Sequence, residues 1–362
     1  MREGNRIRDF DWWLLLIALG ICSLGLMQIY SATHATGLAG MEWRQFWWIV
    51  LGVMGMVIVA RIDYHIILEQ APLLYLTGLG MLTLVLVAGT VKFGARRWLS
   101  VGGFEFQVSE LVKLVIIIVL ARFYSEVRSD RLTLSDLVKA GALTGIPLLL
   151  ILRQPDLGTA LVLVPVAAVG AFLAGVEWKH LVALLLVAVL LLPIGWHFLK
   201  PYQKERIETF LNPSEDPRGS GYQVLQSKIA VGSGGFWGKG FAQGSQNQGG
   251  FLPVRWADFI LAALAEERGF FGVLVTLLLY LALLLRLVQN AQSANDRAGM
   301  YLVMGVAAVL GFHFLVNVAM VIGYMPVTGL PLPLMSYGGS ATLFMFMALG
   351  LVMNVRMRRF VN

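Results

Sequence analysis

The sequence predicts an all-α polytopic membrane protein with about ten transmembrane helices, both termini in the cytoplasm and one large extracytoplasmic loop. Of its 362 residues, 58% are hydrophobic and only 14% are charged, against about 25% charged in soluble domains. The apolar residues occur in long blocks, and a block of about 18 residues suits a hydrocarbon core about 30 Å thick. A soluble fold of this length cannot bury so much apolar surface.

The apolar blocks predict ten spans that form one membrane domain, residues 1–362. The first block differs from a cleaved signal peptide because no small-residue cleavage site follows it, so we interpret it as a retained span. It contains the single cysteine, Cys22, so no intramolecular disulfide can form. The spans run approximately over residues 12–30, 45–60, 72–90, 109–124, 137–152, 157–175, 180–199, 268–287, 299–322 and 339–356.

The distribution of Lys and Arg predicts the orientation, because cytoplasmic loops carry an excess of these residues. A cytoplasmic N-terminus gives that side Arg2, Arg6, Arg8, Arg61, Arg122, Arg128, Arg131, Lys139, Lys179, Arg286, Arg297, Arg356, Arg358 and Arg359. The short extracytoplasmic loops then hold only Arg44, Lys92, Arg96, Arg97 and Arg153. Since the cations are dispersed among loops, the net charge of +7 indicates membrane topology and not a nucleic-acid partner.

The segment 200–267, between the seventh and eighth spans, is too long for a simple connector. It carries ten glycines between Gly219 and Gly250, and glycine permits a close approach of the backbone to a ligand. Its aromatic residues are typical of a segment held at the membrane interface, and they fit poorly with the alternative, a mobile hydrophilic connector. They include Phe210, Tyr222, Phe236, Trp237, Phe241, Phe251 and Trp256.

Several polar side chains lie at membrane depth, where they are costly unless paired or facing a cavity. Glu110 and Lys113 are three residues apart at the start of the fourth span, so they share a helical face. Two roles are open for them, a structural ion pair or part of a substrate groove. On the ninth span, His313 and Asn317 share a face with Tyr324, and an interhelical hydrogen-bond cluster is favoured there over a catalytic site.

Asp258 ends the long segment, just before an apolar run. With Ala262, Ala265 and Gly269 it falls on one narrow stripe of a helix. A carboxylate therefore stands above a face without bulky side chains, which leaves room for a second helix or for the chain of a ligand. The alternative role for Asp258 is an N-terminal helix cap, and the residues alone do not decide between the two.

Motifs of several common sites are not matched. Gly238-Lys239-Gly240 is not a phosphate-binding loop, because Ser233 occupies the upstream glycine position and Gly240 follows the lysine. The sequence has no Cys/His spacing typical of zinc and no Gly-x-Ser-x-Gly elbow. No metal site is predicted from the residues.

Four blocks of residues carry a resemblance to a known family. They are Arg96 to Trp98 with Phe104 to Lys113, Arg153 to Thr159, a long block from Asn212 to Glu267 that includes Asp258, and Asn317 with Pro326 to Ser340. Through these blocks, which span nearly the whole chain, the sequence resembles the SEDS family (shape, elongation, division and sporulation). It is more similar to the RodA branch of that family than to the FtsW branch. Val108 and Tyr324 depart from the pattern, where the family usually has proline and an aliphatic residue.

The resemblance implies a peptidoglycan glycosyltransferase of cell elongation, in the bacterial plasma membrane, with its active site on the extracytoplasmic face. Its substrate would be lipid II, the undecaprenyl-pyrophosphate-linked disaccharide-pentapeptide. Its partners would be a class B penicillin-binding protein with transpeptidase activity, other membrane proteins of the elongation machinery and membrane lipids.

The resemblance also implies site residues. It places the catalytic aspartate at Asp258 and an essential pair at Glu110 and Lys113. The pair and seven further positions in or beside the matched blocks are expected to bind substrate: Lys92, Arg96, Arg97, Arg153, Asp156, Lys239 and Ser336.

The chemistry of such a transfer agrees with these residues. Converting an α-linked pyrophosphate into a β-linked glycan is a single inverting displacement, which needs one general base and not the two carboxylates of a retaining glycosidase. The leaving pyrophosphate needs positive charge, which gives the extracytoplasmic cations Lys92, Arg96, Arg97 and Arg153 a function; attraction to anionic lipid head groups is the alternative. A divalent cation could assist pyrophosphate binding, and no other cofactor is expected.

Two other classes of function stay open. A lipid II flippase would use intramembrane polar groups such as Glu110, Lys113, His313 and Asn317 to line a translocation path, without a catalytic base. A non-catalytic scaffold would only position other wall enzymes. Neither class explains a carboxylate beside extracytoplasmic cations, whereas a polymerase requires both.

Overall fold

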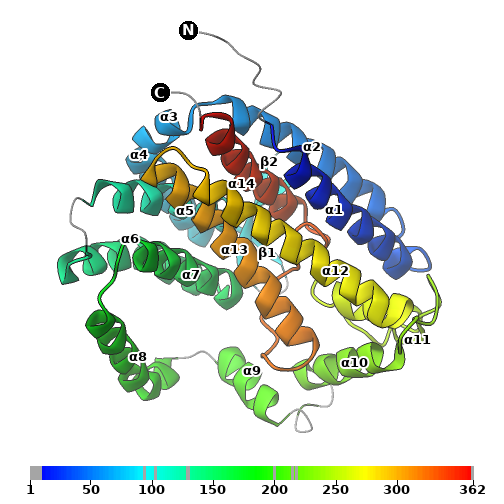
Figure 1. Ribbon diagram of the computed structural model, residues 1–362. Coiled ribbons are helices and arrows are strands. Elements are labelled where there is room, and N and C mark those ends of the chain that lie inside the picture. The colour runs from blue at the N-terminus through cyan, green and yellow to red at the C-terminus, as the bar shows by residue number, and fades with distance from the viewer. Residues whose placement is uncertain are drawn as a thin grey trace.

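The computed structural model describes residues 10–92, 95–101, 104–127, 131–198, 201–212, 216 and 219–359. In this part the chain forms a bundle of long helices with shorter helices at both ends (Figure 1). The helices are α1 (Trp12–Thr33), α2 (Met41–Arg61), α3 (Tyr64–Glu69), α4 (Ala71–Ala88), α5 (Val108–Glu126), α6 (Leu134–Arg153), α7 (Leu157–Leu173), α8 (Trp178–Phe198), α9 (Pro201–Leu211), α10 (Ser220–Ser233), α11 (Ser245–Gln248), α12 (Ile260–Gln292), α13 (Arg297–Val321) and α14 (Gly339–Met357).

Each of the ten predicted spans falls on one of these helices. Seven of the described helices are long and apolar enough to cross a membrane: α1, α2, α4, α6, α12, α13 and α14. The other three ranges coincide with α5, which carries charged residues, with α8, and with α7, a shorter apolar helix of 17 residues. The chain is therefore a helical polytopic membrane protein, while the total of ten spans stays a prediction.

Short polar side chains determine where several helices begin. Asp11, Asp156 and Asp296 each accept a hydrogen bond from the backbone N–H three residues ahead, at the starts of α1, α7 and α13. Such a carboxylate satisfies a free N–H and complements the positive end of the helix dipole. Only a tight turn separates α6, which ends at Arg153, from α7, which begins at Leu157.

The prediction of an all-α fold is wrong for one stretch. Between α4 and α5, the strands β1 (Thr90–Lys92), β2 (Ala95–Val101) and β3 (Phe104–Gln107) form a three-stranded antiparallel sheet. Trp98 pairs with Thr90 on one side and with Gln107 on the other. Hydropathy does not reveal such a sheet, because its strands are short and contain polar and charged residues.

The expected loop 200–267 is largely helical. It contains α9, α10, α11 and the first turns of α12, which begins at Ile260 and not at residue 268 as predicted. Gly269 interrupts α12 with φ 63° and ψ −160°, a conformation that only glycine adopts readily. The eighth span and the helical turns before it are thus two pieces joined at Gly269.

Both described ends of the chain lie at one end of the bundle. The buried carboxylate of Asp11 accepts hydrogen bonds from Arg286 at 2.8–3.0 Å and from Asn290 at 2.8 Å. Arg356, near the end of α14, lies 3.4 Å from the same carboxylate. These contacts hold the beginning of α1 against the ends of α12 and α14. An even number of predicted spans likewise places the two ends of the chain on the same side.

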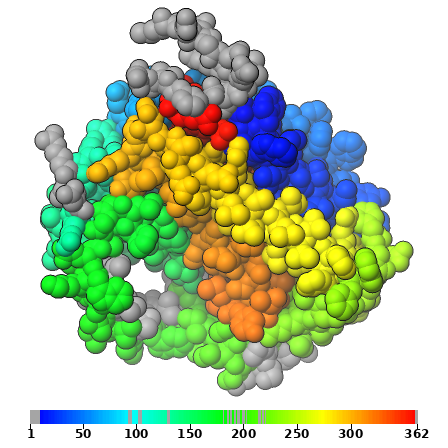
Figure 2. Space-filling view, in the orientation of Figure 1, coloured from blue at the N-terminus to red at the C-terminus, as the bar shows by residue number. Residues whose placement is uncertain are grey.

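The helix α8 stands apart from the bundle (Figure 1), and the space-filling view shows an opening beside it (Figure 2). Its described apolar side chains are largely exposed, among them Trp178 and Leu190. A helix with such a surface is suited to contact with lipid.

We expect Gln243 to be extracytoplasmic and Asn295 to be cytoplasmic, from the Lys/Arg asymmetry. Both side chains are exposed, and they lie at opposite ends of α12. Ser245 is left intact because its hydroxyl bonds to Lys239. With Gln243→Cys or Asn295→Cys in a Cys22→Ser background, an impermeant maleimide should label only position 243 in intact spheroplasts and both positions after permeabilisation. Labelling of 295 but not 243 in intact cells would reverse the orientation.

Candidate active site

Two irregular segments, residues 252–259 before α12 and residues 322–338 between α13 and α14, meet among the helices. Backbone groups that are removed from water need internal partners. The amide of Asn317 on α13 serves both segments, since its Nδ2 donates to the carbonyl oxygen of Asp258 at 2.9 Å and to that of Leu330 at 2.8 Å. One side chain therefore joins the two segments.

Ser336 makes a second joint between them. Its Oγ donates to the carbonyl oxygen of Ala257 at 2.7 Å and accepts from the N–H of Leu332 at 2.9 Å. The N–H of Tyr337 donates to the carbonyl oxygen of Trp256 at 3.0 Å. Because the Ser336 hydroxyl is buried and bonded to backbone, this geometry gives it a positioning role, and its contact with substrate stays a prediction.

Asp258 lies at this junction with its side chain half-buried. Gly329 faces it with φ 74°, and a Cβ added there would lie 3.8 Å from Oδ2 of Asp258. Burial raises the pKa of Asp258 to about 6, while the positive charge of Arg206 acts in the opposite direction. A carboxylate with a pKa close to neutral is able to accept a proton at physiological pH.

The alternative role of Asp258 as a helix cap is wrong. α12 begins at Ile260, its N-cap position is Phe259, and no side chain caps it. The carboxylate is therefore not used by the first turn of the helix.

The stripe of small residues below Asp258 is occupied by the chain itself. Ala262 and Ala265 are buried, and a Cβ added to Gly234 would lie only 2.0 Å from the carbonyl oxygen of Ala265. Further along, the N–H groups of Lys239 and Gly240 donate to carbonyl oxygens of α12, both at 3.0 Å. The stripe permits close packing with the segment after α10, and it ends at the interruption at Gly269.

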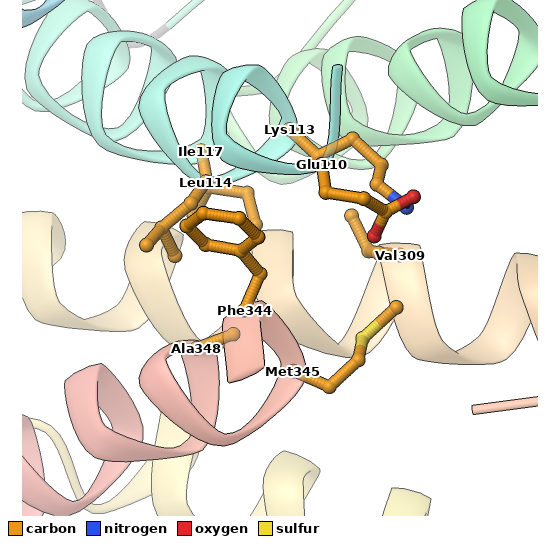
Figure 3. Close-up of a pocket in the computed structure, with 8 residues that line it drawn as sticks. All are labelled: Glu110, Lys113, Leu114, Ile117, Val309, Phe344, Met345 and Ala348. Atoms are coloured by element: carbon orange, nitrogen blue, oxygen red, sulfur yellow. The ribbon is translucent and has the colours of Figure 1, made fainter. Parts of the chain in front are cut away.

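Glu110 and Lys113 form a buried ion pair on α5, with 2.8 Å between Oε1 and Nζ. Figure 3 shows the two side chains lying against each other, between α5, α13 and α14. The cavity beside them has a volume of about 20 Å³, which is enough for one water, since a single water needs about 10–15 Å³. Oε2 of Glu110 lines this region and has no hydrogen-bond partner among the described residues. The pair is enclosed and does not line an open groove.

His313 of α13 extends the pair toward the junction. Its Nε2 lies 3.0 Å from Nζ of Lys113, and its Nδ1 lies 3.2 Å from the carbonyl oxygen of Pro331. A charged Lys113 donates to Nε2, which assigns the proton of a neutral imidazole to Nδ1 and directs it to Pro331. The expected hydrogen-bond cluster is thus present at His313 and Asn317, but Tyr324 does not belong to it, because α13 ends at Val321 and Tyr324 is exposed.

The sequence-predicted cations gather around the sheet and the α6–α7 turn. Arg97 donates to the carbonyl oxygens of Gln154 and Pro155 and lies 3.8 Å from the carboxylate of Asp156. Asp156 also accepts from Gln107 at 3.0 Å and caps α7. Both residues therefore stabilise this turn.

The other three predicted cations are Arg96, Arg153 and Lys92, and the structure describes the side chains of the first two. Arg96 and Arg153 are exposed, and the side chain of Lys92 lies outside the described residues. The turn connects to the junction through Gly158, where a Cβ would lie 2.8 Å from the carbonyl oxygen of Thr328. Gly158 thus packs the α6–α7 turn, to which Arg97 donates, against the Thr328–Leu330 segment.

Lys239 belongs to a different cluster. Its Nζ lies 2.8 Å from Oε1 of the buried Glu266, which also accepts from the N–H groups of Gln246 and Asn247. Those hydrogen bonds and the charge of Lys239 stabilise the buried carboxylate of Glu266. Lys239 therefore balances a buried carboxylate, and a role in substrate binding stays a prediction.

Sequence analysis missed Arg206, whose Nη1 donates to the carbonyl oxygen of Thr328 at 3.4 Å and whose charge acts on Asp258. The count of extracytoplasmic cations covered only the short loops, whereas Arg206 lies on α9 within the long segment. Including the cations of segment 200–267 among the extracytoplasmic ones would have identified Arg206 from the sequence.

The described residues contain no group of three or more His, Cys, Asp and Glu side chains that could hold a metal ion. A divalent cation at Asp258 would therefore need oxygen ligands from the substrate's pyrophosphate, since carboxylate, phosphate and water oxygens are the ligands of Mg²⁺.

The fold and this junction define a class of protein, a polytopic helical membrane protein with an acidic residue held where two irregular segments meet. The model of the FtsW/RodA/SpoVE family, described as cell cycle proteins, matches residues 11–360. The chain belongs to this family, the SEDS family, and resembles its RodA members.

Relatives and solved structures match along nearly the full length. The peptidoglycan glycosyltransferase MrdB of Escherichia coli K12 is 39% identical over 351 residues, which are 96% of this chain and 94% of the relative. A chain from a structure on the coordination of polymerization and crosslinking by a peptidoglycan synthase complex has a TM-score of 0.85 and 36% identity, covering 98% of this chain and 99% of its own. The crystal structure of the rod shape determining protein RodA of Thermus thermophilus has a TM-score of 0.73 and 30% identity, covering 98% of each chain.

Removing one member of the Glu110–Lys113 pair should destabilise the protein strongly. Glu110→Gln leaves a buried ammonium without its counter-charge, at a cost of about 3–5 kcal/mol, and adding Lys113→Met should restore much of the loss. The melting transition can be followed with a thiol-reactive dye, because the single cysteine, Cys22, is buried. Glu126→Gln on the same helix is the control, since the exposed pair Arg122–Glu126 contributes about 0.3–0.5 kcal/mol.

The double variant also separates the two roles left open for the pair. A double variant that folds normally but is inactive would assign the pair to the substrate. One that is folded and fully active, while Glu110→Gln alone is unstable, would assign it to the fold, and a stable, fully active Glu110→Gln would remove both roles.

Proposed function

We propose that this chain is a peptidoglycan glycosyltransferase that polymerises lipid II into glycan strands during cell elongation. The names of its relatives support the activity, since MrdB, RodA and FtsW relatives are peptidoglycan glycosyltransferases. The observation that carries the mechanism is the half-buried Asp258, with a pKa raised to about 6, at a junction where its carboxylate faces Gly329.

In this mechanism Asp258 is the general base. Its carboxylate accepts the proton of the acceptor sugar's 4-hydroxyl while that oxygen attacks the anomeric carbon of the donor, and the bond to pyrophosphate breaks on the opposite face. One displacement inverts the α-linkage to a β-linkage, so no second carboxylate is required. Undecaprenyl diphosphate leaves with the bonding electron pair.

The leaving diphosphate needs positive charge, and the structure offers two groups of cations for it. Arg206 acts on Asp258 directly. Arg97 lies at the α6–α7 turn with the exposed Arg96 and Arg153. Gly158, just after this turn, packs against the Thr328–Leu330 segment. We propose that Arg206 is nearest to the reacting centre and that Arg96 and Arg153 attract and orient the diphosphate.

The site is proposed to face the outside of the bacterial plasma membrane, where the Lys/Arg asymmetry places the end with α10 and α11. The partner is proposed to be a class B penicillin-binding protein, because a structurally similar chain belongs to a complex that couples polymerization to crosslinking. Other elongation proteins and membrane lipids are proposed as further neighbours.

A flippase or a scaffold is disfavoured by the same geometry. A translocation path would have to pass the Glu110–Lys113–His313 chain, whose members are at most 4% exposed. A scaffold has no use for a half-buried carboxylate that neither caps α12 nor pairs with another side chain among the described residues.

Asp258→Asn should abolish most polymerisation and leave the fold intact. The amide keeps the size but cannot accept the proton, so the rate should fall by about 10²–10⁴-fold, and Asp258→Glu should recover little because its carboxylate is displaced. The measurement is gel-resolved glycan length with purified protein and lipid II, with and without the partner. Glu208→Gln, an exposed carboxylate of α9, is the matched control. Chains of wild-type length and rate from Asp258→Asn would remove Asp258 from the mechanism.

The rate should also depend on pH through Asp258. The base must be ionised and its pKa is about 6, so kcat/KM should be constant at higher pH and fall about tenfold per unit below about pH 6. Arg206→Gln removes a charge that favours the ionised form, so it should move this limb to higher pH. An unchanged limb in the residual activity of Asp258→Asn would assign the titration to another group.

A further inference from the structure

A second cavity, of about 240 Å³, lies where the ends of α5 and α7 meet the beginning of α13. It is far larger than the 10–15 Å³ that one water needs. Its lining combines aromatic, aliphatic and cationic side chains: Tyr124, Leu173, Met300 and Tyr301 with Val127 and Arg297. The reaction proposed for Asp258 uses none of these residues.

Two of the lining groups are donors without an acceptor in the described part of the chain. The guanidinium of Arg297 is exposed and makes no ion pair or hydrogen bond there, although it lies close enough to act on Tyr301 electrostatically. Tyr301 is 6% exposed, and its hydroxyl likewise has no hydrogen-bond partner. By contrast, the hydroxyl of Tyr124 donates to the carbonyl oxygen of Ala167 at 2.9 Å. The cavity thus presents one free guanidinium and one free hydroxyl.

Three of the described acidic residues near this end are already engaged. Glu177 pairs with Arg131 at 3.5 Å and Glu126 with Arg122 at 2.8 Å. Asp296 accepts from the N–H of Gly299 at 2.7 Å and lies 2.9 Å from His65. Among the residues that the structure describes, no carboxylate pairs with Arg297, and a guanidinium binds phosphate oxygens through two parallel N–H groups.

The position of the cavity restricts the source of that anion. Arg297 and Asn317 are twenty residues apart on α13, a rise of about 30 Å, and Asn317 contacts Asp258. In Figure 1, α13 crosses the bundle from its beginning at the upper left to its end near the bottom. The cavity therefore lies about one hydrocarbon thickness from Asp258, at the head-group level of the opposite leaflet.

We propose that this cavity binds the phosphate head group of an anionic phospholipid from the leaflet opposite to the catalytic site. Arg297 pairs with the phosphate, Tyr301 donates to it, and the apolar side chains of Val127, Leu173 and Met300 contact the beginning of an acyl chain. Basic pockets between transmembrane helices recognise anionic head groups in this way. The site is independent of the proposed glycosyl transfer.

The test uses the full-length protein purified in a non-ionic detergent. It is titrated with dioctanoyl-phosphatidylglycerol or with dioctanoyl-phosphatidylcholine, and melting is followed through the reaction of a thiol-reactive dye with Cys22, which is buried until the protein unfolds. A ligand that binds only the folded state raises the melting temperature with concentration. The phosphatidylglycerol should raise it and the phosphatidylcholine should not.

The variants then locate the site. Arg297→Gln should weaken the apparent affinity for phosphatidylglycerol about fivefold or more, Tyr301→Phe should weaken it less, and Arg297→Lys should lie between wild type and Arg297→Gln because it keeps the charge without the fork. Arg44→Gln, which removes an exposed arginine at the start of α2 near the Asp258 end, should bind like wild type. If Arg297→Gln does not fold, Arg297→Lys and Tyr301→Phe carry the test.

Three outcomes would overturn the proposal. They are equal binding by wild type and the Arg297 variants, equal shifts with the two lipids, and a full shift with inorganic phosphate at the same concentration, which would assign the cavity to a soluble anion.

Discussion

Irregular backbone placed among membrane helices must find its hydrogen-bond partners inside the protein, and the rest of this structure depends on how that requirement is met. The segments 252–259 and 322–338 are held by side chains of the surrounding helices. Asn317 bonds to both segments, Ser336 closes them on each other, and Tyr280 donates to the carbonyl oxygen of Pro333. Pro326, Pro331 and Pro333 lower the number of N–H groups that need a partner.

The buried charges are part of the same arrangement. Lys113 connects Glu110 to His313, and His313 connects to the carbonyl oxygen of Pro331. The ion pair on α5 is therefore joined to the segment that faces Asp258, although the two sites are distant in sequence. Groups that share one hydrogen-bonded network do not contribute additively, so a change at Glu110 is able to act on the junction as well as on the fold.

Particular residues show how far sequence reasoning reached. The long apolar blocks predicted ten spans, and each of them falls on a helix of the structure. This worked because the free energy of transferring a segment into lipid is a local sum over its residues. The same reasoning missed the sheet of β1, β2 and β3, because short strands with polar and charged residues carry no such signal. It also missed the helical turns from Ile260 to Arg268, which precede the predicted eighth span and end at the glycine conformation of Gly269.

The sequence by itself determined that this chain is a helical membrane protein of the SEDS family, and it singled out Asp258 within an extended segment. Only the tertiary structure decided that Asp258 is not a helix cap, that Lys239 balances Glu266, and that Arg206 is the cation acting on Asp258. Hydropathy and motif spacing are properties of neighbouring residues along the chain. The pKa and the partners of a side chain depend instead on desolvation and on charges contributed by helices far away in sequence, and these exist only once the chain has folded.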